Sequence, residues 1–386
     1  MHSLHGRVKW LFPAMLMAAV LQNFHDLSLL FSEGSLSLFR YDGPIIYKAL
    51  KDILYVSVLA AILYRAQKTA RSPLTGYSGA LIALILFMVA LSMLANGFVA
   101  GLIGLRWIFP FMLFLLMGDW SEVLDTAAAV PWIVLGLAGC LVVQVYQLFY
   151  MPPVFGEIFP GVPARTPGFF VAPNSTAFFA CVSAACVMVF APSKLKLRVL
   201  AVGLALMVSA LAQSGTGIVT AVLLGLRLMC GRHRQVFWMA TLCALALALP
   251  NLDFLTMRED YVELSGGGRL DAFLDIARDS AFSVARFGLY TNTANLQSAN
   301  PEDQLAPDSL MASWAGNFGF FAVLAAVLSA LFIRYRMRAV DWSGAMPCVL
   351  VFGIFSMTTI VFEAFPMNLY LALGIWSARR ATLPAR

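Results

Sequence analysis

Charged residues are scarce in this chain of 386 residues. Asp, Glu, Lys and Arg together make up 12% of the sequence, whereas apolar residues make up 61%. A soluble protein of this size needs about a quarter of its residues charged to cover its surface. The composition therefore excludes a set of water-soluble domains, and we expect a chain whose surface faces lipid.

Cysteine and histidine are also few, and their placement argues against two kinds of site. The six cysteines lie in or beside apolar segments and form no Cys-x-x-Cys pair, which supports neither a disulfide framework nor a zinc site. Of the four histidines, only His25 is expected on the outer side of the membrane, and the longest polar segment has none. We therefore expect neither a histidine-based nucleophile nor a metal site there.

Long apolar runs fill most of the sequence. A bilayer core needs about 20 apolar residues in a helix, and about twelve stretches approach that length. The predicted fold class is an all-α polytopic membrane protein with about twelve transmembrane helices. The predicted spans are 9–29, 46–64, 78–96, 99–118, 129–150, 173–191, 198–213, 215–230, 236–251, 309–333, 343–361 and 366–378.

Clusters of Lys and Arg orient these spans. Residues 65–71, 194–198 and 334–338 hold such clusters, and with twelve spans all of them fall on one side of the membrane. The positive-inside rule assigns that side to the cytoplasm, so both termini are predicted to be cytoplasmic. Although the formal net charge is +6, the basic residues form no single patch, and we expect no nucleic-acid partner.

One long polar segment interrupts the apolar runs. We predict nine transmembrane helices over residues 1–251, a large outer loop over 252–308, and three transmembrane helices over 309–386, all in one integral membrane domain. After Gly268, apolar residues recur at helical spacing, which predicts an amphipathic helix lying against the membrane domain. Its apolar positions are Leu270, Phe273, Leu274, Ala277 and Ala281.

Several arginines lie where the cytoplasmic clusters do not account for them. Arg106 falls inside an apolar run, where a charge costs roughly 2.5–3.5 kcal/mol; it either faces a cavity or a partner, or reaches the interface beside Trp107. Arg165 lies in a stiff Pro- and Gly-rich outer segment, and Arg269 follows three glycines. Each could be a solvated surface residue. Taken together on one side of the membrane, they suit a diphosphate ligand, because guanidinium binds phosphate bidentately.

Asp308 stands out among the carboxylates because it follows Pro307 where the chain re-enters the membrane. Two roles fit this position. It could accept a proton late in an attack by a hydroxyl group. Alternatively, it could cap the helix that follows, a role for which Ser309 competes.

Several short motifs occur in a characteristic order between Ala164 and Trp376. They are RTPGFFVAPNSTAFF, SGTGIVTAVLLGL, SGGGRLDAF with FGLYTN after it, PDSLMASWAGNFGFFAVL and EAFPMNLYLALG. Their order, and the large loop between two late spans, resemble the bacterial O-antigen ligase and O-antigen polymerase superfamily of membrane glycosyltransferases.

The resemblance implies glycosyl transfer on the periplasmic face of the bacterial inner membrane, from a glycan on undecaprenyl diphosphate to a glycan acceptor. Arg269 matches the arginine of the family's large loop, and Arg165 matches the arginine ahead of its PN-type motif. The predicted catalytic residues are Arg269 and Asp308. The predicted substrate-binding residues are Arg106, Arg165, Arg278 and Arg286. No metal or other cofactor is expected, since diphosphate already leaves readily and arginine stabilises its charge.

Two departures from the family pattern favour a polymerase over a ligase. Family ligases often carry His where this chain has Asp308, and commonly have an Arg within the motif that here is SGTGIVT. We therefore expect polymerisation of repeat units into O-antigen, capsule or exopolysaccharide. A ligase that moves finished glycan to a lipid core or a protein is the first alternative. A polysaccharide transporter or flippase is the second, although no clear internal repeat supports it. Expected partners are the bilayer and proteins of polysaccharide export or chain-length control.

Overall fold

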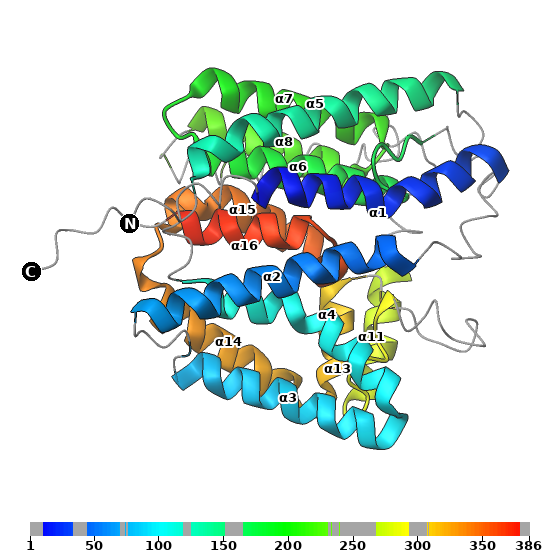
Figure 1. Ribbon diagram of the computed structural model, residues 1–386, viewed down its shortest axis with the longest axis vertical. Helices are drawn as coiled ribbons and strands as arrows, with labels where there is room; N and C mark the ends of the chain where they lie inside the picture. Colours follow the sequence, from blue (N-terminus) through cyan, green and yellow to red (C-terminus); the bar gives the residue numbers. More distant parts are fainter. Residues whose placement is uncertain are drawn as a thin grey trace, which may run out of the picture. The chain divides into compact units, whose positions relative to one another are not determined.

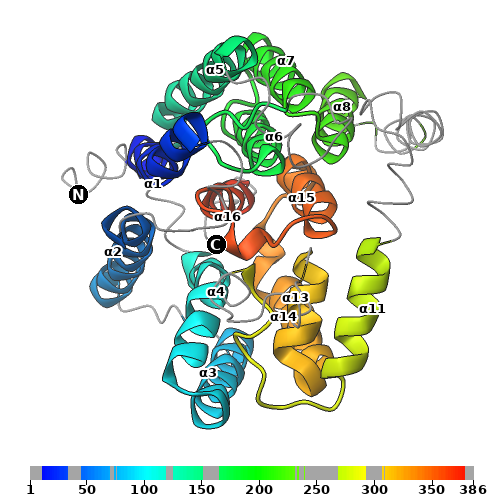
Figure 2. The same cartoon turned by 90° about the vertical axis from the view of Figure 1, so that its right-hand side faces the viewer.

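A computed structural model describes most of the chain. The described residues are 11–33, 45–69, 74, 76–118, 125–150, 165–230, 233, 239, 268–292, 307 and 309–378. The regular elements in these ranges are helices, which confirms the predicted all-α class. Figures 1 and 2 label these helices. The chain divides into two compact units, and each is described by itself.

Helices occupy the predicted spans from 9–29 to 215–230 and those after residue 308, whereas the predicted span 236–251 lies outside the described residues. Within the described residues, five helical segments are long and apolar enough to cross a membrane. They are Gly76–Asn96, Phe98–Leu116, Thr126–Tyr150, Pro173–Phe190 and Leu310–Ala339. Several such segments in one chain indicate a multi-pass membrane protein. The number of twelve spans and the orientation of the termini stay predictions.

Unit 1 comprises residues 1–54, 123–264 and 342–354. In this unit α6 packs against α5, α7 and α8, and Figure 2 shows these three helices around it. Nearly all of its side chains are buried, as expected for a helix that is apolar on all sides. The helices of the unit are α1 (Leu11–Glu33), α5 (Thr126–Tyr150), α6 (Pro173–Phe190), α7 (Leu195–Leu211), α8 (Gly215–Cys230) and most of α15 (Trp342–Ser356).

Unit 2 comprises residues 55–122, 265–341 and 355–386. Here α3 packs against α4 and α14, and α13 packs against α11. The helices of the unit are most of α2 (Ile45–Thr69), α3 (Gly76–Asn96), α4 (Phe98–Leu116), α11 (Gly268–Ser280), α13 (Leu310–Phe318), α14 (Ala322–Arg336) and α16 (Met367–Ser377). The predicted span 309–333 is thus two helices, which the 3₁₀ turn Gly319–Phe321 joins. The break falls at Gly319, whose φ of 48° is left-handed and favours glycine.

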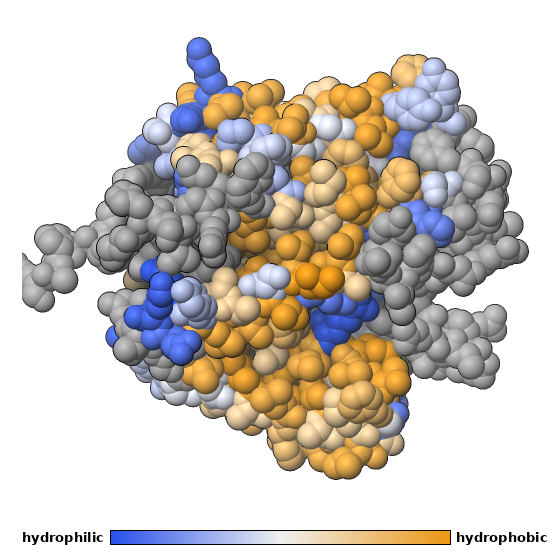
Figure 3. Space-filling view, in the orientation of Figure 1, coloured by the Kyte–Doolittle hydropathy of each residue, from blue (hydrophilic) through white to orange (hydrophobic). Residues whose placement is uncertain are grey.

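Large apolar side chains cover much of the outside of both units. Leu86, Phe87 and Leu94 of α3 are all at least half exposed, and Figure 3 shows hydrophobic residues over this part of the surface. A soluble monomer rarely exposes apolar side chains on this scale. Lipid contact accounts for them.

Candidate functional site

Arg165 is held in unit 1 by hydrogen bonds from its guanidinium. Its Nε donates to the carbonyl of Ala212 at 3.0 Å, and its Nη2 donates to the side-chain oxygen of Asn174 at 3.0 Å. Asn174 is the second residue of α6, and Ala212 follows the end of α7. Neither of these hydrogen bonds neutralises the guanidinium charge.

The residues after Arg165 are held by three side chains that point into the unit. Gln144 donates to the carbonyl of Thr166 at 3.0 Å, and Thr176 donates to the carbonyl of Pro167. Gln147 pairs with Gly168 twice, accepting from its N–H at 2.7 Å and donating to its carbonyl at 2.9 Å. All three side chains are buried. This network fixes the backbone that leads out of Arg165.

The first turns of two helices lie close to this arginine. Asn174 belongs to the first turn of α6. Ser214, two residues beyond Ala212, accepts a hydrogen bond from the N–H of Gly217 in the first turn of α8 at 3.3 Å. Helix N-termini carry partial positive charge and attract anions. The guanidinium of Arg165 lies in the same part of unit 1.

In unit 2 the predicted amphipathic helix is present as α11, but its buried face differs from the predicted one. Leu270 and Leu274, which we expected to be apolar contacts, are exposed. Ile276 is fully buried instead and packs with Tyr290 and Ala312, with Phe273 against them. Ile276 lies on the buried face because that side of α11 packs against α13.

Arg269, in the first turn of α11, differs from the other arginines of this segment. Its side chain is half-buried. Within residues 268–292 and the rest of the described chain, no hydrogen bond or ion pair involves its guanidinium. Among the described residues, no ion pair therefore offsets its charge at this positive end of the helix.

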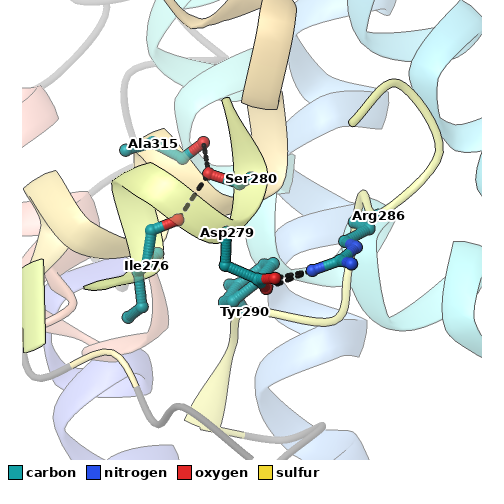
Figure 4. Close-up of polar contacts among 6 residues, drawn as sticks. All are labelled: Ile276, Asp279, Ser280, Arg286, Tyr290 and Ala315. Carbon is teal, nitrogen blue, oxygen red and sulfur yellow. Dashed lines mark hydrogen bonds and ion pairs between the residues drawn. The ribbon is translucent and has the colours of Figure 1, made fainter. Parts of the chain in front are cut away.

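Arg278 and Arg286, by contrast, both pair with aspartates. Arg278 lies 3.8 Å from Asp275, with both side chains mostly exposed. Arg286 forms an ion pair with Asp279 and donates to the hydroxyl of Tyr290 at 2.8 Å, while that hydroxyl donates to Asp279. Figure 4 shows the three side chains converging beside the C-terminal end of α11. Their contribution to substrate binding stays a prediction.

The ionisation of this triad follows from its hydrogen bonds. The Tyr290 hydroxyl is the largest cause that lowers the pKa of Asp279, and the charge of Arg286 adds to it. Burial, together with the hydrogen bond to Asp279, raises the pKa of Tyr290. At neutral pH, Asp279 is therefore ionised and Tyr290 is protonated. The triad ties the C-terminal end of α11 to the segment that follows.

Asn317 of α13 holds the FGLYTN segment from the other side. Its side-chain oxygen accepts from the N–H of Gly288 at 2.7 Å, and its nitrogen donates to the carbonyl of Tyr290 at 2.8 Å. Gly288 has a left-handed φ of 96°, and a Cβ at this position would lie 2.2 Å from the carbonyl oxygen of Ala100 in α4. Only glycine fits this contact.

The remaining predicted site residues are described only in part. Arg106 lies in α4 and is half-buried. Asp308 lies outside the described residues. Of the two helix caps considered for this position, Ser309 takes the role, since its hydroxyl accepts from the N–H of Ala312 at 3.1 Å. Arg165 belongs to unit 1 and the other predicted arginines belong to unit 2, so each is described in its own unit.

Sequence reasoning missed the polar residues that position these arginines. Gln144 and Gln147 lie in an apolar run, six and three residues before its end at Tyr150, and two amides three residues apart on one helix face were the available signal. Asn174 and Asn317 stood inside the motifs but received no role. Tyr290 also stood inside a motif, FGLYTN, but its pairing with Asp279 depends on a turn between them that the sequence did not indicate.

Within the described ranges, no three His, Cys, Asp or Glu side chains come close enough together to hold a metal ion. No family model, curated protein or solved structure matches the chain.

Proposed function

We propose that this protein is a membrane glycosyltransferase that polymerises undecaprenyl-diphosphate-linked repeat units into O-antigen, capsule or exopolysaccharide. The reaction would take place on the periplasmic face of the inner membrane. The order of the sequence motifs and the multi-pass helical character of the chain support this proposal. The ligase activity described above is the alternative within the same chemistry.

The observation that carries the proposal is the difference between the arginines of unit 2. Arg278 and Arg286 lie beside aspartates, whereas Arg269 has no such partner among the described residues. An arginine that forms no ion pair within the described residues, at the positive end of a helix, suits a ligand with two or more negative charges. The diphosphate of a lipid-linked donor is such a ligand.

The chemistry requires little beyond this charge. The acceptor hydroxyl attacks the anomeric carbon of the donor sugar, the bond from that carbon to the diphosphate oxygen breaks, and undecaprenyl diphosphate leaves. Arg269 would stabilise the negative charge that develops on the departing oxygen. The proton of the acceptor hydroxyl would pass to Asp308 or to a phosphate oxygen of the ligand.

Arg165 supports the same proposal from unit 1. Hydrogen bonds to the carbonyl of Ala212 and the side-chain oxygen of Asn174 hold its guanidinium in place. A fixed guanidinium beside the first turns of α6 and α8 is suited to phosphate. We assign it a role in binding the donor.

The test is the lipid-linked glycan profile of a deletion strain that expresses Arg269→Gln. We expect single repeat units to accumulate on undecaprenyl diphosphate while the protein stays at its normal level. Arg278→Gln removes the same charge from the same helix, and we expect a smaller loss because that charge is already paired. Lys194→Gln serves as the control for charge loss, since Lys194 is an exposed residue of unit 1.

The same profile separates the competing functions. Long polymer held on undecaprenyl diphosphate would indicate a ligase. Normal polymer in the Arg269→Gln strain would refute a catalytic role for this arginine. Transport of labelled lipid-linked glycan by the purified protein, without formation of a glycosidic bond, would indicate a flippase.

A further inference from the structure

Two arginines lie over one tyrosine ring at the C-terminal end of α14. The guanidinium carbon of Arg338 is 4.9 Å from the ring centroid of Tyr335, and that of Arg334 is 5.9 Å from the same centroid. The ring of Tyr77, at the start of α3, stacks on Tyr335 with centroids 5.2 Å apart and planes 16° apart. All four side chains are exposed. They are called the Tyr335 cluster below.

The positive charge of the Tyr335 cluster is not cancelled within the described part of the chain. Neither Arg334 nor Arg338 forms an ion pair with a described carboxylate. Arg338 donates from Nε to the carbonyl of Arg334 at 3.3 Å, which leaves its charge in place. Two guanidinium groups beside one ring repel each other, and an anion between them would remove that repulsion.

An exposed apolar stripe leads along α14 to the Tyr335 cluster. Val323 is 74% exposed and Val327 is 49% exposed. Val327 and Arg334 follow Val323 by 4 and 11 residues, so the three side chains lie on one face of the helix. They belong to the segment Leu310–Ala339, which is long and apolar enough to cross a membrane and is mostly unburied.

We propose that the Tyr335 cluster binds the phosphate of an anionic phospholipid, whose acyl chains lie along the Val323–Val327 stripe. Arg334 and Arg338 bind the phosphate, and the stacked rings of Tyr335 and Tyr77 hold both guanidinium groups at the depth of the lipid head groups. A charged head group above an apolar stripe matches a phospholipid, whereas a soluble phosphate would use the charge and leave the stripe exposed.

This site does not depend on the proposed glycosyltransferase function. The general preference for basic residues on the cytoplasmic side does not account for this cluster, since that preference requires charge but no aromatic ring. Lys194 and Lys196 provide the comparison. Both are exposed basic residues at the start of α7, and no ring contact involves either of them within the described ranges.

The experiment titrates the purified full-length protein with dioleoylphosphatidylglycerol and measures the first bound lipid by native mass spectrometry. We expect Arg334→Gln/Arg338→Gln to weaken that first binding event about tenfold or more. Lys194→Gln/Lys196→Gln removes the same charge and is expected to leave it unchanged. Tyr335→Ala should weaken binding about three- to fivefold, whereas Tyr335→Phe, which keeps the ring, should not.

Three results would overturn the proposal. The first is an equal loss of binding in the two double variants, which would mean that surface charge alone attracts the lipid. The second is equal binding of dioleoylphosphatidylcholine by the unaltered protein. The third is full competition by millimolar inorganic phosphate, which would point to a soluble anion. If the double arginine variant unfolds, the comparison of Tyr335→Ala with Tyr335→Phe still decides the question.

Discussion

Replacing Gln147 by leucine should destabilise unit 1 and release the segment that follows Arg165. The side chain of Gln147 is 1% exposed. Its amide satisfies both the N–H and the carbonyl of Gly168, at 2.7 Å and 2.9 Å. Leucine has a similar volume but can make neither hydrogen bond. The substitution therefore leaves two backbone groups buried without partners.

The size of the effect follows from those two groups. A buried polar group that loses its partner costs about 1–3 kcal/mol, and the apolar leucine side chain regains part of this cost. We expect a net loss of about 2–4 kcal/mol in the free energy of unfolding. For a unit of this size, this corresponds to a decrease of about 5–15 °C in Tm.

Thermal unfolding in detergent, followed with a thiol-reactive dye, measures this effect, because Cys140 and Cys181 of unit 1 are buried and free. Gln22→Leu is the matched control. The side-chain oxygen of Gln22 is buried and has no hydrogen-bond partner in the described residues, so the same substitution should lower Tm by only a few degrees or less. Equal Tm values for Gln147→Leu and Gln22→Leu would refute the role assigned to Gln147.

Two further predictions concern the segment after α11. Tyr290→Phe removes the main cause of the lowered pKa of Asp279. A carboxyl group whose pKa is lower in the folded state stabilises that state above about pH 4, and this stabilisation is lost as the pH falls through the folded-state pKa. The variant should therefore lose less Tm than the unaltered protein between pH 6 and pH 3, and equal losses would contradict this reasoning. Gly288→Ala should prevent stable folding, because its Cβ would lie 2.2 Å from the Ala100 carbonyl oxygen. Gly79→Ala, with no atom within 4 Å of its Cβ, should fold normally, as protein yield and size-exclusion chromatography would show.

The sequence predicted where helices occur because long apolar runs need a helical backbone in lipid. It did not predict that the stretch 309–333 breaks at Gly319, since the residues on both sides are equally apolar and only the left-handed φ reveals the break. The helix after Gly268 was also predicted. Its predicted apolar face included Leu270, Phe273 and Leu274, of which Phe273 packs and the two leucines are exposed, because hydrophobicity alone cannot indicate which side α13 covers.

The sequence indicated the candidate arginines by their position and by the free-energy cost of a charge in an apolar segment. It did not indicate which residues surround them. Arg269 and Arg286 look alike in the sequence, yet within the described residues Arg286 forms an ion pair with an aspartate and Arg269 does not. That pairing depends on the turn between α11 and Tyr290, which brings together residues seven and eleven positions apart. Charge patterns in a sequence show which residues are basic. Whether a basic residue is available to a ligand depends on such turns.

The position of α6 affects how the protein can be built into a membrane. Among the five segments of the described chain that are long and apolar enough to cross a bilayer, α6 is the least apolar and by far the most enclosed by protein. Alone in lipid, it would expose Thr176 and Ser183, which the folded unit buries. We therefore expect α6 to leave the translocation machinery together with α5 or α7, as a hairpin. Lengthening the connection between α6 and α7 should impair insertion more than lengthening a connection at the edge of the unit.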